Sequence, residues 1–177
     1  MSFPLKLIGQ VSKNKSILDI QNILKNNLPK TFRDIPFYQL WISDMAQVCE
    51  VFCKTLNTHE VGFCLATNRG CRRYHIDNVP MRLLVTYAGK GTEWIPHEAV
   101  DYKNLVKGSE NKKILKDTSK RKFMNIWDVA IFNGGPRGLL HRTPDVALNE
   151  PSVLMRLDHP SFWENINKDQ KTLKVMT

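Results

Sequence analysis

The stretch that decides the fold is Met81-Arg-Leu-Leu-Val-Thr-Tyr87, followed by Ala88-Gly-Lys-Gly91 and Thr92-Glu-Trp-Ile95. Residues 81–87 are rich in aliphatic, Thr and aromatic side chains, a composition that predicts a strand. The Gly-rich residues 88–91 predict a turn, and residues 92–95 predict a second, short strand that Pro96 ends. This stretch therefore predicts two strands separated by a Gly-rich turn.

Further short strands are predicted on both sides of this stretch. They lie at residues 59–66, 126–132, 139–143 and 152–158, and Gly- or Pro-containing turns punctuate them. Strands in series without intervening helices are typical of an antiparallel sandwich or barrel. Residues 97–124 are expected to form one long polar, basic loop.

Two helices are predicted before these strands. Residues 15–27 place apolar side chains at helical spacing, with Ser16 as a candidate N-cap. A longer helix is expected over residues 34–56, with Pro36 in its first turn and a continuous apolar stripe along one face. We expect this stripe to pack against the sheet.

The chain of 177 residues is long enough for a single domain with a core of its own. We expect an α+β protein with a helical part at residues 1–58, a β barrel at residues 59–160 and a tail at residues 161–177. No apolar run approaches the roughly 18 residues that cross a bilayer. The first residues are too quickly polar for a secretory signal, so a cytoplasmic location is expected.

A candidate metal site lies in Tyr74-His75-Ile76-Asp77 and in Leu140-His141-Arg142-Thr143. In an extended strand, residues two apart point to the same side, so His75 and Asp77 share a face that His141 can reach from a neighbouring strand. Two His and one carboxylate form the ligand set of non-haem Fe(II) oxygenases, and zinc accepts the same donors. We therefore predict that His75, Asp77 and His141 bind a metal and are catalytic.

The cysteines offer a second possible metal site, built from Cys49, Cys53, Cys64 and Cys71. Their spacing lacks the closely paired cysteines of a zinc knuckle. Free Cys behaves as a small core residue, so we expect reduced, buried thiols instead.

The net charge of +9 is concentrated in residues 103–122, which carry eight Lys and Arg against Glu110 and Asp117. No aromatic residues interleave with these lysines as they do on base-stacking platforms, so nucleic acid is not an expected partner. We expect a solvated, flexible loop. The alternative is a lid or a contact for an anionic substrate.

Three motifs resemble the hallmarks of the uncharacterised bacterial family DUF1826. They are Cys-Arg-Arg-aromatic-His-x-Asp, Arg-Leu-Leu-x-Thr-Tyr-x-Gly-x-Gly-Thr-Glu-Trp and Gly-Leu-x-His-Arg-Thr-Pro, and they stand at residues 71–77, 82–94 and 138–144. The order of these motifs is also similar to that of the 2-oxoglutarate/Fe(II) dioxygenases. This resemblance implies a double-stranded β-helix, which is a jelly-roll or cupin-like barrel.

The resemblance further implies that the metal is Fe(II) and that 2-oxoglutarate is a cosubstrate. A basic residue of the last strand would pair with the far carboxylate of 2-oxoglutarate. Five side chains are candidates for holding this cosubstrate: Arg156, Arg142, Arg82, Tyr87 and Thr86. Arg156 can instead pair with Asp158 or Glu93, and it follows His141 at an unusually long spacing.

The expected function is that of an Fe(II)/2-oxoglutarate-dependent oxygenase that hydroxylates a small molecule or a peptide. The alternative is a zinc-binding, cupin-like protein without oxygenase activity, with a role in metal homeostasis or hydrolysis. A nucleic-acid-binding module that uses residues 103–122 is a third and weaker hypothesis.

Overall fold

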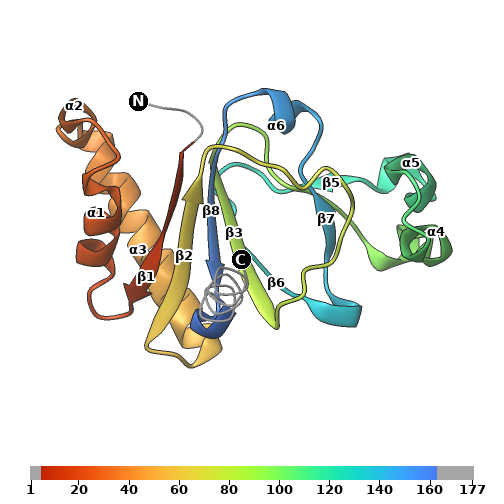
Figure 1. Cartoon of the computed structure of the whole chain (residues 1–177), viewed down its shortest axis with the longest axis horizontal. Helices are drawn as coiled ribbons and strands as arrows, with labels where there is room; N and C mark the ends of the chain where they lie inside the picture. Colours follow the sequence, from red (N-terminus) through yellow and green to blue (C-terminus); the bar gives the residue numbers. More distant parts are fainter. Residues whose placement is uncertain (1–4, 163–177) are drawn as a thin grey trace, which may run out of the picture. The chain divides into compact units, whose positions relative to one another are not determined.

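The computed structural model describes residues 5–162, and the chain divides into two compact units (Figure 1). The first unit comprises Met1–Leu65 and Arg156–Thr177, and the second comprises Ala66–Met155. The predicted tail lies almost wholly outside the described residues. Within those residues, no helix has both the length and the apolar character needed to cross a bilayer.

The first unit carries three helices and the strands at the two ends of the described chain. Its elements are β1 (Lys6–Ser12), α1 (Ser16–Lys25), α2 (Lys30–Arg33), α3 (Pro36–Leu56), β2 (Glu60–Ala66) and the end of β8 (Val153–Asp158). The strand order is β1-β2-β8. Both predicted helices and the strand at residues 59–66 are confirmed, whereas β1 was not predicted, so this part of the chain is not purely helical.

Helix α3 forms for the reasons that its sequence suggests. Pro36 occupies its first turn, and the predicted apolar stripe is buried from Trp41 to Phe52, whereas Phe37 and Leu40 at its start are exposed. The predicted N-cap of α1 is wrong. Ser16 is the first buried residue of α1, and its hydroxyl donates to Oε1 of Glu50 at 2.8 Å, so it joins α1 to α3 instead of capping a helix.

The second unit holds most of the strands, in two groups. Its elements are β3 (Met81–Ala88), β4 (Glu93–Ile95), η1 (His97–Ala99), α4 (Tyr102–Val106), α5 (Asn111–Ile114), η2 (Thr118–Lys120), β5 (Lys122–Phe123), β6 (Ala130–Asn133), η3 (Gly135–Arg137), β7 (Leu140–Arg142), α6 (Val146–Asn149) and the start of β8. The strand orders are β8-β3-β6 and β5-β4-β7. The α+β class is confirmed. Over the described residues the strands form antiparallel sheets and no closed barrel, and the double-stranded β-helix stays a prediction.

Strand registers position the site. Trp94 of β4 pairs with His141 of β7, and Arg82 of β3 pairs with Phe132 of β6.

The strand predicted at residues 126–132 begins only at Ala130. The reason is Trp127, whose φ of 67° is incompatible with a strand and whose N–H donates to the carbonyl oxygen of Thr86 at 2.8 Å.

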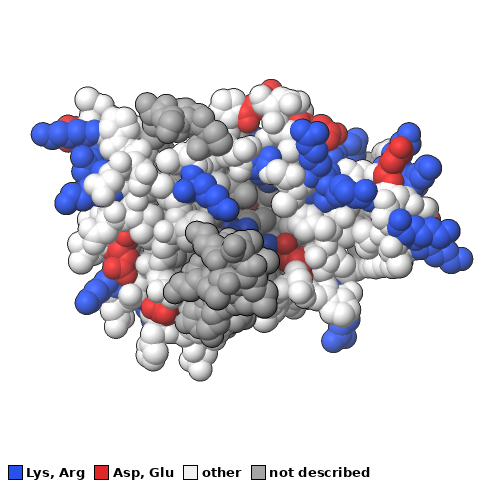
Figure 2. Space-filling view, in the orientation of Figure 1, with Lys and Arg blue, Asp and Glu red and all other residues white. Residues whose placement is uncertain are grey.

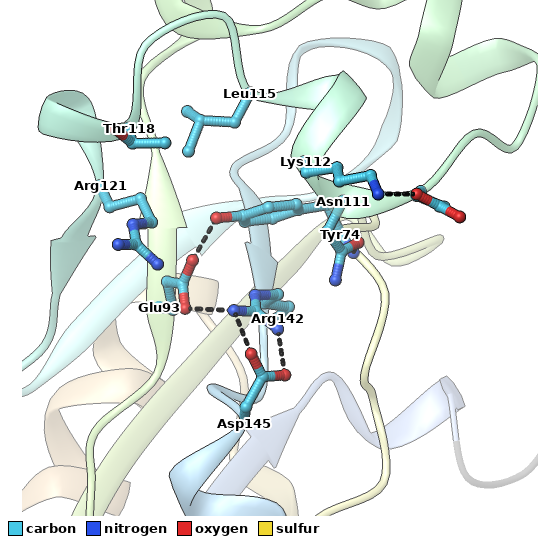
Figure 3. Close-up of a pocket in the computed structure, with 10 residues that line it drawn as sticks. Tyr74, Glu93, Asn111, Lys112, Leu115, Thr118, Arg121, Arg142 and Asp145 are labelled. Carbon is cyan, nitrogen blue, oxygen red and sulfur yellow. Dashed lines mark hydrogen bonds and ion pairs between the residues drawn. The ribbon is translucent and has the colours of Figure 1, made fainter.

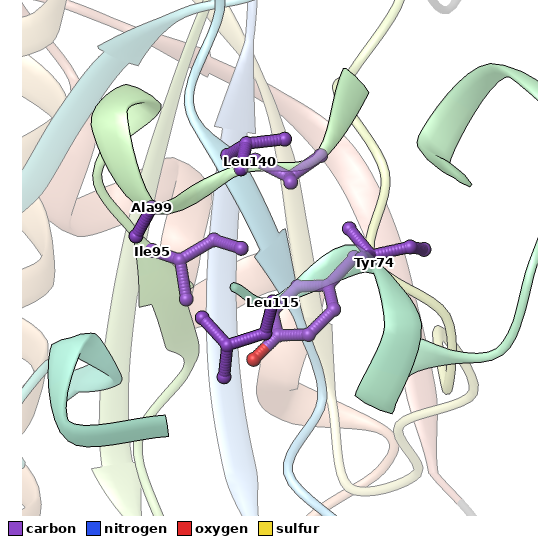
Figure 4. Close-up of a cluster of buried hydrophobic side chains, with 7 residues drawn as sticks. Tyr74, Ile95, Ala99, Leu115 and Leu140 are labelled. Carbon is purple, nitrogen blue, oxygen red and sulfur yellow. The ribbon is translucent and has the colours of Figure 1, made fainter. Parts of the chain in front are cut away.

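The expected flexible loop at residues 97–124 is instead folded into η1, α4, α5, η2 and β5. Its ends are joined by an antiparallel bridge between Val100 and Leu115. Scattered apolar residues anchor it in a buried cluster (Figure 4), whose members are Tyr74, Ile95, Ala99, Val100, Ile114, Leu115 and Leu140. The lysines of this segment therefore project from a folded layer.

Candidate metal centre

The two predicted histidine ligands lie opposite each other on paired backbone. His75 forms an isolated antiparallel bridge with His141 of β7, and the N–H of each residue donates to the carbonyl oxygen of the other at 3.1 Å. Directly paired residues of an antiparallel ladder project their side chains to the same side. The two imidazole rings accordingly lie with their centroids 4.5 Å apart.

Asp77 joins the histidines from the segment that follows His75. Its carbonyl oxygen accepts the N–H of Gly135 at 2.8 Å, which fixes the backbone at this point. Gly134 makes the approach possible, because a Cβ there would lie 2.4 Å from the carbonyl oxygen of Asp77 and 2.1 Å from that of Val79. The turn before β7 thereby holds Asp77 beside the two rings.

The donor atoms of the three side chains are spaced as metal ligands are. Nε2 of His75 lies 3.4 Å from Oδ1 of Asp77, and Nε2 of His141 lies 3.5 Å from Oδ2. All three ligand atoms lie within 4.8 Å of one another. Two donors that each stand about 2.1 Å from one cation are separated by roughly 3.0–3.4 Å, so the group closes around a cation with small side-chain adjustments.

Both imidazole rings are oriented by backbone carbonyl groups. Nδ1 of His75 lies 2.9 Å from the carbonyl oxygen of Arg73, and Nδ1 of His141 lies 3.0 Å from that of Leu139. A carbonyl oxygen only accepts, so each Nδ1 carries a hydrogen and each Nε2 faces Asp77. Outer hydrogen bonds of this kind fix the orientation of metal-binding histidines in proteins.

Arg82 holds the carboxylate of Asp77 by one oxygen. Nη1 of Arg82 lies 2.6 Å from Oδ1, and both side chains are buried. Oδ2 is also buried, and it accepts no hydrogen bond. A buried carboxylate oxygen without a hydrogen-bond donor is unusual, because it loses its hydration without compensation. Oδ2 of Asp77, which lies 3.5 Å from Nε2 of His141, is suited to a single bond with a cation.

Without a metal, the electrostatics of the group favour an ionised Asp77 and a protonated His75. Burial raises the pKa of Asp77, but the hydrogen bond with His75 and the charges of His141 and Arg82 outweigh this effect and lower the pKa to about 2. Hydrogen bonds with Asp77 and Cys71 raise the pKa of His75 to about 10. Burial lowers the pKa of His141, which favours its neutral form. A metal would therefore replace a proton at His75.

The centre is open on one side only. The His75 side chain is 34% exposed, whereas those of Asp77 and His141 are 7% exposed. The ring of Phe132 lies 5.0 Å from that of His141 and forms an apolar wall. Solvent and ligands therefore reach the donors at His75.

The hydroxyl candidates on β3 project to opposite faces of the strand. Thr86 shares the face of Arg82, because the two residues are four apart in a strand. Tyr87 points to the other face and packs edge-on against Trp127, with ring centroids 4.9 Å apart. Of these two, only Thr86 is on the side of β3 from which Arg82 contacts Asp77.

Arg142 contacts carboxylates away from the metal ligands (Figure 3). Its guanidinium lies 2.8 Å from Glu93 and 2.7 Å from Asp145, and it stands over the ring of Tyr74. The Tyr74 hydroxyl donates to the same Glu93 carboxylate. The structure thus brings Arg142 into a network of its own and not to His141, its neighbour in the chain.

Arg156 belongs to the first unit, whereas the three donors belong to the second. Its Nε lies 3.0 Å from Oδ2 of the fully buried Asp158, and its guanidinium stands over the ring of Phe162. The pairing with Asp158 is the alternative that the sequence left open.

The cysteines do not form the four-cysteine zinc site. Cys49, Cys53 and Cys64 are buried, as expected, and burial raises the pKa of the Cys49 thiol. Cys71 is exposed, in contrast to the expectation, because it lies in the loop between β2 and β3. Its side chain contacts His75.

Two features of this region were not predicted from the sequence. The first is that Arg82 contacts Asp77, and the second is the buried network of Tyr74, Glu93 and Arg142. A signal for the network was present, since Tyr74 and Arg142 are the chain neighbours of the two histidines. In strands, such neighbours point to opposite faces.

The model of a family described as a protein of unknown function, DUF1826, matches residues 8–158. No curated protein matches the chain.

Proposed function

The chain belongs to the DUF1826 family, and from this premise and the geometry of the metal centre we propose that it is a metal-dependent oxygenase. The metal is Fe(II), and the cosubstrate is 2-oxoglutarate. One observation carries the proposal: two imidazole nitrogens and one carboxylate oxygen converge from His75, His141 and Asp77. This donor set leaves positions open on a six-coordinate metal.

The strand order supports a double-stranded β-helix as the fold. From His75 onward, and apart from β5, which follows β4 in the same sheet, the chain alternates between the sheet of β4 and β7 and the sheet of β3 and β6. Such alternation is typical of jelly-roll proteins, whose two sheets face each other. The metal ligands would then lie on the inner face, next to Phe132.

The residues of the chain have distinct roles in this proposal. His75, Asp77 and His141 bind the metal, the carbonyl groups of Arg73 and Leu139 orient the rings, and Arg82 restricts Asp77 to one coordinating oxygen. When bound, Fe(II) supplies the redox chemistry by which O₂ and 2-oxoglutarate hydroxylate a C–H bond of the substrate, with succinate and CO₂ as co-products.

The arginine that binds the cosubstrate stays a prediction. All three arginines already contact a carboxylate, Arg82 that of Asp77, Arg142 that of Glu93 and Arg156 that of Asp158, so these contacts do not choose among them. Because Arg156 contacts the carboxylate of Asp158, 2-oxoglutarate would have to share or displace that contact. We expect Arg156→Lys, which retains the charge but loses the guanidinium fork, to weaken 2-oxoglutarate binding without affecting the metal.

A zinc-binding protein without oxygenase activity is the second candidate. The observation that favours it is the exposed Cys71, which brings a thiol, a good zinc donor, to the open side of the centre. The metal content of protein purified without added metal separates the two. Stoichiometric zinc that resists exchange with iron supports this second function.

Anaerobic titration tests the oxygenase proposal. Metal-free protein is loaded with Fe(II), and 2-oxoglutarate is added while the weak visible charge-transfer band is followed. We expect the band in the unchanged protein and in His59→Ala, which alters an exposed histidine, and its loss in His75→Ala and His141→Ala. A folded protein that binds Fe(II) but gives no band would exclude 2-oxoglutarate as the cosubstrate.

A further inference from the structure

The layer that carries the metal ligands has a second face. In β7, His141 points to the metal side and Arg142 to the opposite side, and the pairing partners Trp94 and Glu93 follow the same alternation. Tyr74, the neighbour of His75, packs with Glu93 and Arg142. The metal centre and the second face therefore lie on opposite sides of the same layer of strands.

A pocket of about 320 Å³ lies on this second face, between the strands and the folded segment of α5 and η2 (Figure 3). Its volume is at the lower end of the range of small-molecule sites. Tyr74 and Leu115, both buried and both members of the apolar cluster, provide an apolar wall. Thr118 and Arg121 border the pocket on the side of η2.

Three cationic and three acidic side chains line the pocket, and close ion pairs hold two of the three cations. Arg142 pairs with Glu93 and Asp145, and Lys112 pairs with Glu110 at 2.9 Å. Within residues 5–162, the exposed guanidinium of Arg121 makes no close ion pair, although its charge acts on the exposed carboxylate of Asp145.

Two further observations point to an anionic ligand. Nε of the buried Arg142 has no acceptor. Lys and Arg side chains also gather over α4 and α5 (Figure 2), so the surroundings of the pocket are positively charged. A negative group entering here meets Arg121 without displacing an existing ion pair.

We propose that this pocket binds a small organic anion, in which a carboxylate or phosphate group is attached to a compact apolar body. Arg121 and the hydroxyl of Thr118 hold the anionic group, and Tyr74 and Leu115 contact the apolar body. The site is distinct from the metal centre, and it does not depend on the proposed oxygenase activity.

The probes are phenyl phosphate and benzoate, which carry the two anionic groups on the same ring, with phenol and inorganic phosphate as matched fragments. Each is titrated into the isotope-labelled full chain, and backbone amide shifts are followed by NMR. We expect saturable shifts at residues 111–121 with at least one of the two anions. That anion should bind at least tenfold more tightly than phenol and at least tenfold more tightly than inorganic phosphate. Whichever of phenyl phosphate and benzoate binds more tightly identifies the preferred anionic group.

Variants separate the pocket from the general basic surface. Arg121→Gln should weaken the anion at least tenfold, and Thr118→Val should weaken it several-fold. Lys107→Gln removes the same charge from the exposed end of α4, outside the pocket, and should change the affinity less than twofold. The proposal is overturned if neither anion binds saturably, if phenol binds as tightly, or if Arg121→Gln and Lys107→Gln have equal effects.

Discussion

Arg82 and Asp77 form a buried ion pair through a single carboxylate oxygen, with Nη1 of Arg82 2.6 Å from Oδ1. The other oxygen, Oδ2, lies 3.5 Å from Nε2 of His141 and accepts no hydrogen bond. Arg82 thus has two effects on the metal centre. It compensates the charge of a buried carboxylate, and it directs the remaining oxygen toward the histidines.

Replacing Arg82 tests the first effect. Arg82→Gln removes the closer of the two cations beside the buried Asp77 carboxylate, the other being His75, and removal of one partner of a buried pair costs about 3–5 kcal/mol. We expect the free energy of unfolding of the metal-free protein to fall by that amount in urea denaturation. Arg137→Gln, at an exposed arginine of η3, should have almost no effect. Equal stabilities of the two variants would show that Arg82 does not compensate Asp77.

Binding of a divalent metal should stabilise the second unit. A ligand at one hundred times its Kd stabilises the folded state by about 2.7 kcal/mol. We expect Fe(II) or Zn(II) to raise the Tm of the unchanged protein, and a chelator to reverse the rise. In His141→Ala the rise should vanish, whereas in His59→Ala it should persist. Metal stabilisation that survives in His141→Ala would place the metal elsewhere.

The proximity of His75 and Asp77 could be predicted from the sequence, because their spacing obeys a local rule. Residues two apart in an extended segment share a face, so His75 and Asp77 had to point together. The contact of Arg82 with Asp77 follows no local rule, since it depends on which strand passes beside the His75 segment. Likewise, nothing local distinguishes Arg142, which is adjacent to His141 and points away from it.

The helices and strands show the same difference between features that local sequence patterns predict and features that depend on packing. Helix α3 and strand β3 have long periodic patterns, and the structure confirms both. Residues 97–124 have no such pattern, because Val100, Ile114 and Leu115 are isolated among lysines and are buried only through packing on the strands. The late start of β6 depends on one residue, Trp127, whose positive φ the sequence does not predict.

Gly134 and Gly135 should respond to different extents to the same substitution. In Gly134→Ala the added Cβ collides with two backbone carbonyl groups, at Asp77 and Val79, so we expect a loss of about 3 kcal/mol and weaker metal binding. In Gly135→Ala the Cβ meets open space, and only the φ of 71° is strained, at a cost of about 1–2 kcal/mol. Chemical denaturation and metal titration of both variants measure the difference. Equal losses would contradict the tight packing of Gly134 against Asp77.

The two carboxylates that contact Arg142 should differ greatly in their contribution to stability. Glu93 is buried and also accepts a hydrogen bond from Tyr74, whereas the Asp145 side chain is 79% exposed. Glu93→Gln leaves Arg142 without a buried counter-charge, so we expect a loss of about 3 kcal/mol or more. Asp145→Asn removes a solvated pair and should cost less than about 1 kcal/mol.

A double-mutant cycle decides whether the loss at Glu93 comes from its pairing with Arg142. The cycle combines Glu93→Gln with Arg142→Gln, and the unfolding free energies of the four proteins give the coupling. If the pair acts as a unit, the double variant should be more stable than the sum of the single losses predicts, because neither buried charge is then left alone. Additive losses would mean that each residue acts through its other contacts, the hydroxyl of Tyr74 for Glu93 and Asp145 for Arg142.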